Sequence, residues 1–431
     1  MEINRLDKKN REALAEALAK RSTESFGDLE AKVADIIDNV RSRGDAALFE
    51  YSEKFDHFTL TKENIRVTDE EIKAAVEESD PRFIEVLERA AENIRTFHEK
   101  QKRISWIDTN GDGSILGQKF TALEKVGVYV PGGKAAYPSS VLMNIIPAKV
   151  AGVERIIMLT PPGQGGSISR DTLAAASVAG VDEVYRVGGA QAIAAMAYGT
   201  ETVPKVHKIC GPGNIFVALA KRAVYGRVSI DSIAGPSEIL VLADESADAR
   251  FVAADLLSQA EHDEMASAIL VTTSEKLAEA VKAEIEGFVP KLSRSTIIQK
   301  SLDDYGFIFV ADDMDTAVDA VNDIASEHLE IMTEDPWSVM PRIKNAGAIF
   351  LGPWSSEPLG DYFAGPNHIL PTNGTAKFFS PLNVDDFMKK TSIISYSKAA
   401  LERDHRDIEF FAEKEGLTAH ANSVAVRFEG K

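Results

Sequence analysis

The sequence predicts an α/β protein with two three-layer α/β domains. From about Val126 onward, short apolar strands alternate with helical stretches, which is typical of a parallel sheet covered by helices on both faces. A second array of the same kind begins near Glu238. With 431 residues, the chain is long enough for two or three cores at roughly 100–200 residues per domain.

The N-terminal part of the chain is predicted to be a helical scaffold without obvious chemistry. Apolar residues recur at three- and four-residue spacing in Leu6–Arg21 and Leu29–Arg41. Thr68 and Glu71 form a capping box that predicts the start of another helix. Pro81 stands where the first turn of a further helix would begin.

The first array has four expected strands separated by helices. The strands are VGVYV at 126–130, RIIML at 155–159, EVYRV at 183–187 and HKIC at 207–210. The helices are Ser139–Ala151, Arg170–Ala179, Ala190–Tyr198 and Asn214–Tyr225. Ligands bind beyond the carboxyl ends of the strands in such sheets, so we expect a binding site there.

Glycine-rich loops follow several of these strands. They are Pro131-Gly132-Gly133, Gly163-Gln164-Gly165-Gly166, Gly188-Gly189 and Gly211-Pro212-Gly213. Glycines at such places let backbone amides approach a phosphate at a helix N-terminus. The GxGxxG fingerprint is absent, because Ile168 stands where the third glycine would be. The repeated loops favour nucleotide binding, with tight turns as the alternative.

The second array repeats the pattern, and a polar tail follows it. Its strands are EILVLAD at 238–244, SAILVTT at 267–273, FIFVA at 307–311 and AIFLG at 348–352. Its helices are expected at 247–261, 275–287, 314–325 and 337–344. The tail after Val384 is predicted to be mostly helical and too small for a large core. Between the N-terminal helices and the first array, Asn110–Gly113 predicts a hairpin turn.

The segment 351–391 breaks both apolar periods and is rich in proline and glycine, which favours neither a helix nor a long strand. Such a long irregular run is usually an active-site loop or a linker. Five of its aromatic residues argue that it packs, since linkers are poor in aromatics. They are Trp354, Tyr362, Phe363, Phe378 and Phe379. A purely structural loop is the alternative.

Composition excludes several classes of protein. Apolar residues make up 44% and charged residues 27%, which is ordinary for a globular protein. A net charge of −19 without a basic block argues against nucleic acid and anionic membrane as main partners. No run reaches 18 apolar residues, and the N-terminus lacks the apolar region of a signal peptide. Cys210 is the only cysteine, so a cytoplasmic setting fits and any zinc must be held by N and O ligands.

Four residues form a possible metal site. Gln259 and His262 are three residues apart near a helix end, so they share one helix face. Asp361 and His420 would complete a set with two histidines, one carboxylate and one amide, which suits zinc or manganese. The spacing is long-range, and a surface polar pair remains the alternative for the first two residues.

Glu327 and His328 are candidates for acid/base chemistry. They follow a helix and open an expected strand, SEHLEIM, where neighbouring side chains point to opposite faces. Both can reach one pocket only if the backbone turns at that point. Histidine is a common general base, although a buried histidine bonded to a backbone carbonyl is the alternative interpretation.

At these residues the chain closely resembles the histidinol dehydrogenase family, almost from end to end. The matching stretches are VGVYVPGG at 126–133, GGAQAIAA at 188–195, GPGN at 211–214, IDSIAGPSEILVLAD at 230–244, SQAEHD at 258–263, SEHLEI at 326–331, LGDYFAGPNHILPT at 359–372 and EGLTAHANSV at 415–424. The resemblance implies oxidation of L-histidinol to L-histidine in two NAD-dependent steps through L-histidinaldehyde.

The resemblance also implies a role for each site residue. Zinc, one ion per subunit, would be bound by Gln259, His262, Asp361 and His420. His328 would be the general base, and Glu327 would activate the water that attacks the aldehyde. Substrate contacts would come from the zinc ligands, His328, Ser237, His368 and Glu415, and NAD contacts from Tyr129, Gln191 and Asn214.

For the architecture, the resemblance implies two Rossmann-like three-layer α/β domains with small helical N- and C-terminal extensions. The expected limits are 1–25 for the N-terminal helical extension, 26–125 with 239–383 for the catalytic domain, 126–238 for the NAD-binding domain and 384–431 for a C-terminal dimerisation tail. The family forms homodimers, so Glu415 and His420 would complete the partner's site.

Other functions stay open at this point. A related zinc-dependent alcohol dehydrogenase could act on another polar substrate, such as a sulfonated diol. A nucleotide- or metabolite-binding module without catalysis would leave Glu327 and His328 unexplained. An acidic scaffold protein is disfavoured by the glycine-rich loops.

Overall fold

The computed structural model describes residues 1–21, 27–132, 137–233 and 235–429 and divides into two compact units. The larger unit comprises Met1–Gln101 and Leu123–Phe387, and the smaller one comprises Lys102–Ala122 and Met388–Lys431. Both parallel sheets belong to the larger unit, which confirms the α/β class. Gly133 of the first glycine-rich loop lies outside the described residues.

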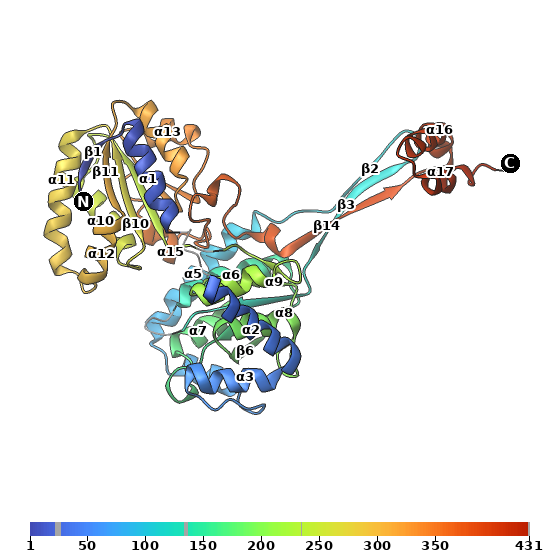
Figure 1. The fold of residues 1–431 in the computed structure, drawn as a ribbon, viewed down its shortest axis with the longest axis horizontal. Helices are drawn as coiled ribbons and strands as arrows, with labels where there is room; N and C mark the ends of the chain where they lie inside the picture. Colours follow the sequence, from blue (N-terminus) through green and yellow to red (C-terminus); the bar gives the residue numbers. More distant parts are fainter. Residues whose placement is uncertain (22–26, 133–136, 234, 430–431) are drawn as a thin grey trace. The chain divides into compact units, whose positions relative to one another are not determined.

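The first array forms a five-stranded parallel sheet in the order β6-β5-β4-β7-β8. Its strands are β4 (Lys125–Tyr129), β5 (Arg155–Thr160), β6 (Glu183–Arg186), β7 (Lys208–Cys210) and β8 (Ser229–Ile230). The helices on one face are α2 (Gly27–Arg43), α3 (Asp45–Tyr51), α8 (Gly189–Tyr198) and α9 (Ile215–Val224). The other helices of this part, α5 (Pro81–Glu99), α6 (Pro138–Ala151) and α7 (Arg170–Ala179), pack together, with α6 against β4 (Figure 1).

The second array forms a six-stranded parallel sheet in the order β1-β11-β10-β9-β12-β13. The strands are β1 (Ile3–Arg5), β9 (Glu238–Ala243), β10 (Ser267–Thr272), β11 (Gly306–Val310), β12 (His328–Met332) and β13 (Ala348–Leu351). Ile239 and Val241 of β9 face α10 (Ala249–Ala260), α11 (Glu275–Phe288) and α12 (Ser295–Tyr305), whereas Leu240 and Leu242 face α1 (Lys8–Lys20) and α13 (Met314–Ile324) (Figure 1). This alternation explains why every residue of β9 is buried.

The remaining helices also agree with the sequence in part. The capping box of Thr68 and Glu71 is present at the start of α4 (Asp69–Glu77), and Pro81 opens α5. The predicted helix at 337–344 is shorter, with α14 (Pro336–Val339) followed by a single 3-10 turn. The sequence interpretation missed β1, β8 and α12. No helix in the described ranges is long and apolar enough to cross a membrane.

The segment 351–391 differs from its prediction in two ways. It contains a short helix, α15 (Glu357–Tyr362), which is too short to produce a clear apolar period. The inference that its aromatic residues make the loop pack is wrong for four of them. Their exposed fractions are 83% for Trp354, 61% for Tyr362, 73% for Phe378 and 48% for Phe379.

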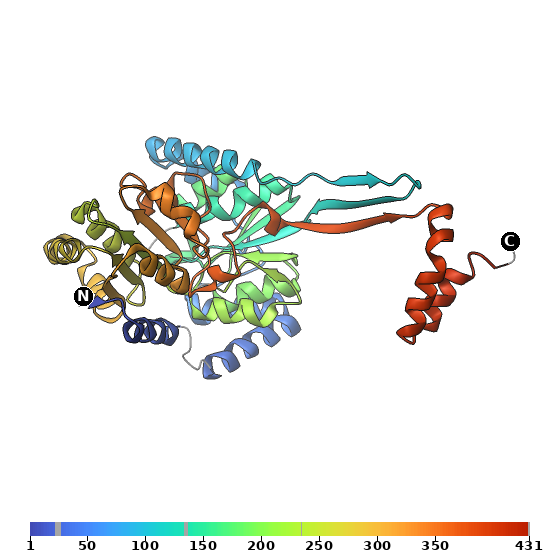
Figure 2. The same cartoon turned by 90° about the horizontal axis from the view of Figure 1, so that it is seen from above.

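The smaller unit is an antiparallel sheet with two helices. Its order is β14-β3-β2, with β2 (Trp106–Thr109), β3 (Ile115–Ala122) and β14 (Met388–Ser395). The predicted hairpin turn at Asn110–Gly113 joins β2 to β3. The tail after Val384 begins with a short 3-10 helix at Val384–Phe387, continues as β14, which pairs with β3 along eight residues, and ends in α16 (Lys398–Lys414) and α17 (Thr418–Ala425) (Figure 2).

Candidate active site

The acid/base pair lies at the amino end of β12. His328 is the first residue of that strand, and the backbone bends at Glu327 just before it. From the sequence, both side chains could reach one pocket only if the backbone turned at this point. The bend provides this turn, because it lets the neighbouring side chains approach each other. Glu327 Oε2 lies 3.7 Å from His328 Nδ1, and both side chains are buried.

The backbone of Glu238, at the start of β9, holds both members of the pair. Its amide donates to Glu327 Oε2 at 2.9 Å, and its carbonyl lies 3.1 Å from His328 Nδ1. A carbonyl only accepts, so Nδ1 of His328 carries the hydrogen in this bond. His328 Nε2 has no hydrogen-bond partner among the described residues and lies 3.7 Å from Asp361 Oδ1.

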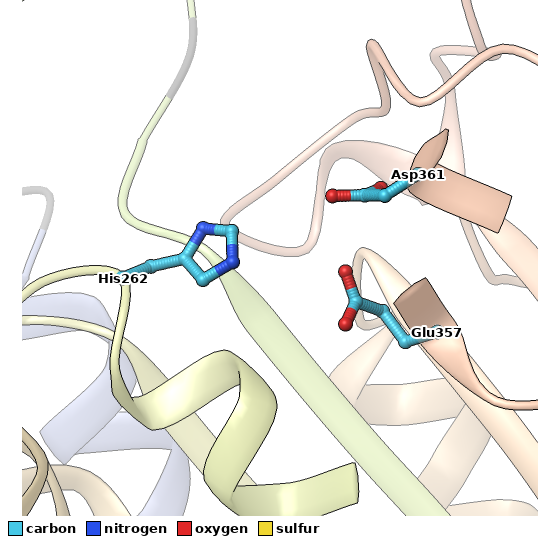
Figure 3. Close-up of side chains that lie close together, drawn as sticks. All are labelled: His262, Glu357 and Asp361. Atoms are coloured by element: carbon cyan, nitrogen blue, oxygen red, sulfur yellow. The ribbon is translucent and has the colours of Figure 1, made fainter. Parts of the chain in front are cut away.

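Three potential ligand residues gather beside this pair. Glu357 and Asp361 are four residues apart on α15 and therefore share one helix face. Ligand atoms of His262, Glu357 and Asp361 all lie within 4.8 Å of one another, and their side chains converge (Figure 3). The sequence interpretation included His262 and Asp361 but missed Glu357. Its four-residue spacing from Asp361 was the available signal, hidden by the proline-rich surroundings.

Gln259 lies one turn before His262, near the end of α10. Its side chain is fully buried, and neither the amide oxygen nor the amide nitrogen has a hydrogen-bond partner in the described structure. Buried amides without a partner are rare and costly in folded proteins. Part of His262 is exposed, yet burial of its ring lowers the pKa of His262, which favours the neutral imidazole that a metal requires.

Burial and close charges perturb the acids of this site. Burial alone would raise the pKa of Asp361, but the neighbouring histidines outweigh it and lower this pKa to about 2. Burial and the Asp361 charge raise the pKa of Glu357 to about 8. Burial raises the pKa of Glu327 to about 7, against the attraction of His328. Asp361 is therefore ionised at neutral pH, whereas Glu357 holds a proton.

His328 is the base most affected by these carboxylates. Burial lowers the pKa of His328, but Glu327 and Asp361 reverse this effect and raise the pKa to about 10. His328 thus stays protonated at neutral pH while both carboxylate charges act on it.

A cavity of about 280 Å³ opens next to His328. It is bounded by β13, α15 and the loop that follows, and its lining includes His328, Asp361 and His368. His368 Nδ1 lies 3.1 Å from the carbonyl of Asp361, and its Nε2 lies 3.3 Å from the hydroxyl of Ser140. Burial lowers the pKa of His368, so this ring presents a neutral face to the cavity.

The other predicted substrate and metal residues belong to two different units of the chain. Ser237 directly precedes β9, and its carbonyl accepts the amide of Ser267 at 3.0 Å. Glu415 caps the end of α16, and His420 lies in α17, both exposed and both within the smaller unit.

The predicted NAD contacts lie at the carboxyl end of the five-stranded sheet. Tyr129 ends β4, and its hydroxyl accepts the amide of Gly189 at 3.1 Å. Gln191 is buried in α8, while Asn214 is exposed and caps α9. A cavity of about 1120 Å³ opens at the same end, lined partly by Pro131, Gly132, Pro161 and the 163–166 loop. Of the described residues that line it, none is Tyr129, Gln191 or Asn214.

A family model for histidinol dehydrogenase matches residues 19–428 of the chain. The chain belongs to the histidinol dehydrogenase family. A histidinol dehydrogenase of Halalkalibacterium halodurans is 57% identical over 411 residues, covering 95% of this chain and 96% of the relative. That of Geobacillus kaustophilus is 58% identical over 397 residues, covering 92% and 93%.

A solved structure extends the comparison to three dimensions. The crystal structure of histidinol dehydrogenase from Elizabethkingia anophelis matches with a TM-score of 0.94 and 38% identity, covering 99% of this chain and 97% of the other. The chain is accordingly an enzyme of the oxidoreductase class, and its α/β fold is that of the histidinol dehydrogenase family.

Proposed function

We propose that the chain oxidises L-histidinol to L-histidine through L-histidinaldehyde, in two NAD-dependent steps and with one zinc ion per subunit. The observation that carries this proposal is the buried Gln259 amide, which has no partner among the described residues and is close in sequence to the neutral His262. A bound metal ion would supply the partner that such a buried amide requires.

The donor set fits zinc. Gln259 and Asp361 offer oxygen, and His262 offers a neutral nitrogen, which are the atom types that zinc accepts without thiolates. His420 is the expected fourth ligand. Zinc bound there would hold the imidazole and amine of the amino alcohol and polarise its reacting carbon–oxygen group. Manganese is an alternative ion for the same donors.

His328 and Glu327 divide the proton transfers. His328 Nε2 has no hydrogen-bond partner in the described part of the chain, and the residue lines the smaller cavity, so this nitrogen can take the alcohol proton. Base function requires that part of the negative charge that raises its pKa be compensated. Glu327, whose pKa is about 7, can take a proton from the water that adds to the aldehyde. His368, Ser237 and Glu415 are the proposed additional substrate contacts.

NAD is proposed to bind at the carboxyl end of the five-stranded sheet. Tyr129, Gln191 and Asn214 are the proposed contacts, and the large cavity nearby has room for part of a dinucleotide. Glycines in the 163–166 loop allow close approach of the backbone to a phosphate. We place this activity in the cytoplasm.

The active form is proposed to be a homodimer. Glu415 and His420 are exposed in the smaller unit, and so are Ile394, Phe410 and Phe411. Exposed apolar residues of this size are typical of a surface that a second copy of the chain covers. Glu415 and His420 would then complete the site of the partner.

The decisive experiment measures NADH formed from L-histidinol. Two NADH per L-histidinol and L-histidine as product are expected, because the overall reaction uses two NAD⁺ and one water and releases three protons. A chelator should stop the reaction, and added zinc should restore it. Turnover of another alcohol in place of L-histidinol would instead identify a related dehydrogenase.

Subunit mixing tests the shared site. His420→Ala and Glu327→Gln variants should each be nearly inactive alone. After subunit exchange, mixed dimers should regain part of the activity, since one site receives both intact residues. No recovery after exchange has been verified by mass would show that each subunit forms its own site.

A further inference from the structure

Arg21, which follows α1, is an arginine with a completely buried side chain. Its Nη1 donates to Glu238 Oε1 at 3.1 Å and to the hydroxyl of Ser267 at 2.9 Å. Its Nη2 donates to the carbonyls of Pro236 at 2.9 Å and Ser237 at 3.4 Å. One guanidinium therefore holds the whole 236–238 segment.

The same segment holds the acid/base pair from its other side. The amide of Glu238 donates to Glu327, and the carbonyl of Glu238 accepts from His328. Two successive sets of hydrogen bonds thus connect Arg21 with both groups through the 236–238 segment.

We propose that Arg21 is a positioning residue for the reaction, which fixes the 236–238 segment and through it the orientation of Glu327 and His328. The inference rests on the proposed function, because that function gives these two residues their roles.

The bonding pattern is more than charge neutralisation of Glu238. A counter-charge for one carboxylate needs one contact, and a lysine could supply it. Here the Nη2 bonds go to two neutral backbone carbonyls, and a rigid planar fork satisfies all acceptors at once. The Ser237 carbonyl belongs to the same peptide group as the Glu238 amide that donates to Glu327, so the fork limits how that stretch of backbone can move.

Two variants separate positioning from neutralisation. Arg21→Lys keeps a positive charge beside Glu238 but cannot span the four acceptors. Arg21→Met with Glu238→Gln removes both charges and keeps the Glu238 backbone. We expect both proteins to fold with thermal midpoints near that of the wild type. We also expect kcat to fall about 10–100-fold in both, because small displacements of catalytic groups are costly.

A matched control uses another buried cation with an acidic partner. Lys208 Nζ lies 3.1 Å from Asp386 Oδ1 in the five-stranded part of the larger unit. The double variant Lys208→Met with Asp386→Asn removes a buried cation and its partly exposed acidic partner without touching the 236–238 segment. It should leave kcat unchanged.

A second measurement does not depend on turnover. In protein labelled with ¹⁵N-histidine, the Nδ1–H of His328 should give a hydrogen-bonded proton signal, assigned by its loss in His328→Gln. We expect this signal to be shifted or lost in both Arg21 variants. Should the wild type fail to oxidise L-histidinol, the proposed function would fail, while this signal would still decide the role of Arg21.

Wild-type kcat together with an unchanged His328 signal in either folded variant would overturn the proposal. Arg21 would then serve only as a counter-charge. If Arg21→Lys did not fold but the double variant folded with wild-type kcat, Arg21 would likewise serve only as a counter-charge, and the proposal would be overturned.

Discussion

The two parallel sheets of the larger unit bury ionisable side chains in opposite ways. Beside the five-stranded sheet, Lys208 pairs with Asp386, and Lys221 pairs with Asp231 while donating to the carbonyl of Gly211 at 3.0 Å. At the six-stranded sheet, five buried acids face only two buried bases, Arg21 and His328, among the described residues. The acids are Glu238, Asp255, Glu327, Glu330 and Glu357.

This difference separates a structural role from a functional one. A buried pair of opposite charges satisfies itself and needs nothing from outside. Like charges that are crowded in a dry place raise their own pKa values, as burial does for Asp255, Glu330 and Glu357. Such a cluster supports the proposed cation site, because a bound cation would offset the excess of negative charge.

The two sheets also use opposite edges. The larger cavity opens at the carboxyl ends of β4, β5 and β6, as expected for a nucleotide site. The acid/base pair lies instead at the amino ends of β9 and β12. Sites at the amino edge depend on residues before the strands, such as Ser237 and Glu327, which carry no glycine-rich signature.

The largest expected effect comes from His328→Ala. Removing the proposed base should lower kcat for both oxidation steps by about 10²–10⁴-fold, the usual contribution of a general base. Stopped-flow and steady-state NADH formation would measure it, with L-histidinol and L-histidinaldehyde as substrates.

The matched control is His98→Ala. His98 is also fully buried, but its Nδ1 lies 2.7 Å from the carbonyl of Ile94 in its own helix. Its loss should destabilise the protein by about 1–3 kcal/mol and leave kcat unchanged. Equal turnover of L-histidinol by the His328 variant and the wild type would remove the contrast between the two histidines.

Asp231→Asn tests the five-stranded sheet, where buried charges form pairs of opposite sign. The substitution leaves Lys221 buried without its counter-charge, so the free energy of unfolding should fall by about 3–5 kcal/mol in urea titrations. Lys221→Met added to it should recover much of the loss. The affinity for zinc should not change, since the pair lies in the other sheet. A loss below about 1 kcal/mol would mean that this pair does not stabilise the fold as a buried pair does.

Glu327→Gln tests the six-stranded sheet, where buried acids outnumber buried bases. Glutamine keeps the size of the side chain and can still accept from the amide of Glu238, but it cannot take a proton from water. Oxidation of L-histidinaldehyde should slow about 100-fold, while oxidation of L-histidinol slows much less. Equal losses in both half-reactions would exclude water activation by Glu327.

The sequence was sufficient to predict the fold class, because strands that are buried on both faces appear in the sequence as continuous apolar runs. β9, β10 and four of the five strands of the first array were predicted within one or two residues, whereas the two-residue strand β8 was missed. β1 has three residues and β14 is largely exposed, so neither produced such a signal. The helix α12 was missed, and α15 spans under two turns.

For the site, the types of residue could be predicted from the sequence, but their proximity in the folded chain could not. Gln259 and His262 were recognised from helical spacing, yet only the structure shows that the Gln259 amide is buried and unpaired. The link from Glu238 to Glu327 and His328 runs through backbone atoms, which have no sequence signature. Arg21 is far from the site in sequence and resembles any helix-terminal arginine.

Gln259→Met tests whether the unpaired amide exists for a ligand. In metal-free protein, methionine removes two buried polar atoms without partners, so the free energy of unfolding should rise by about 1–3 kcal/mol. The increase in thermal midpoint that zinc gives the wild type should disappear. Calorimetry with zinc and with chelator would measure both, and the exposed Gln299→Met serves as control. A destabilised metal-free variant would mean that the amide already has a partner.

The smallest effect is expected for Asp56→Asn. Asp56 is an exception in the five-stranded part, because its buried carboxyl oxygen lacks, among the described residues, the cationic partner that Asp231 has there. Asp56 ends a π-helical turn, and its Oδ2 is buried without a partner in the described structure. Burial raises the pKa of Asp56 from 3.8 to about 6, against the attraction of His57. A carboxyl group whose pKa is raised by folding stabilises the protein below its unfolded pKa and loses that contribution as pH rises through the folded value. The free energy of unfolding of the asparagine variant should therefore match that of the wild type near pH 4 and exceed it by about 1 kcal/mol at pH 8, a value reduced for partial exposure.

Urea titrations of NAD-free protein across this pH range would measure this difference, with the exposed Asp35→Asn as control. A pH-independent difference would mean that the Asp56 carboxylate is already compensated, and the five-stranded region would then contain no exception at this position.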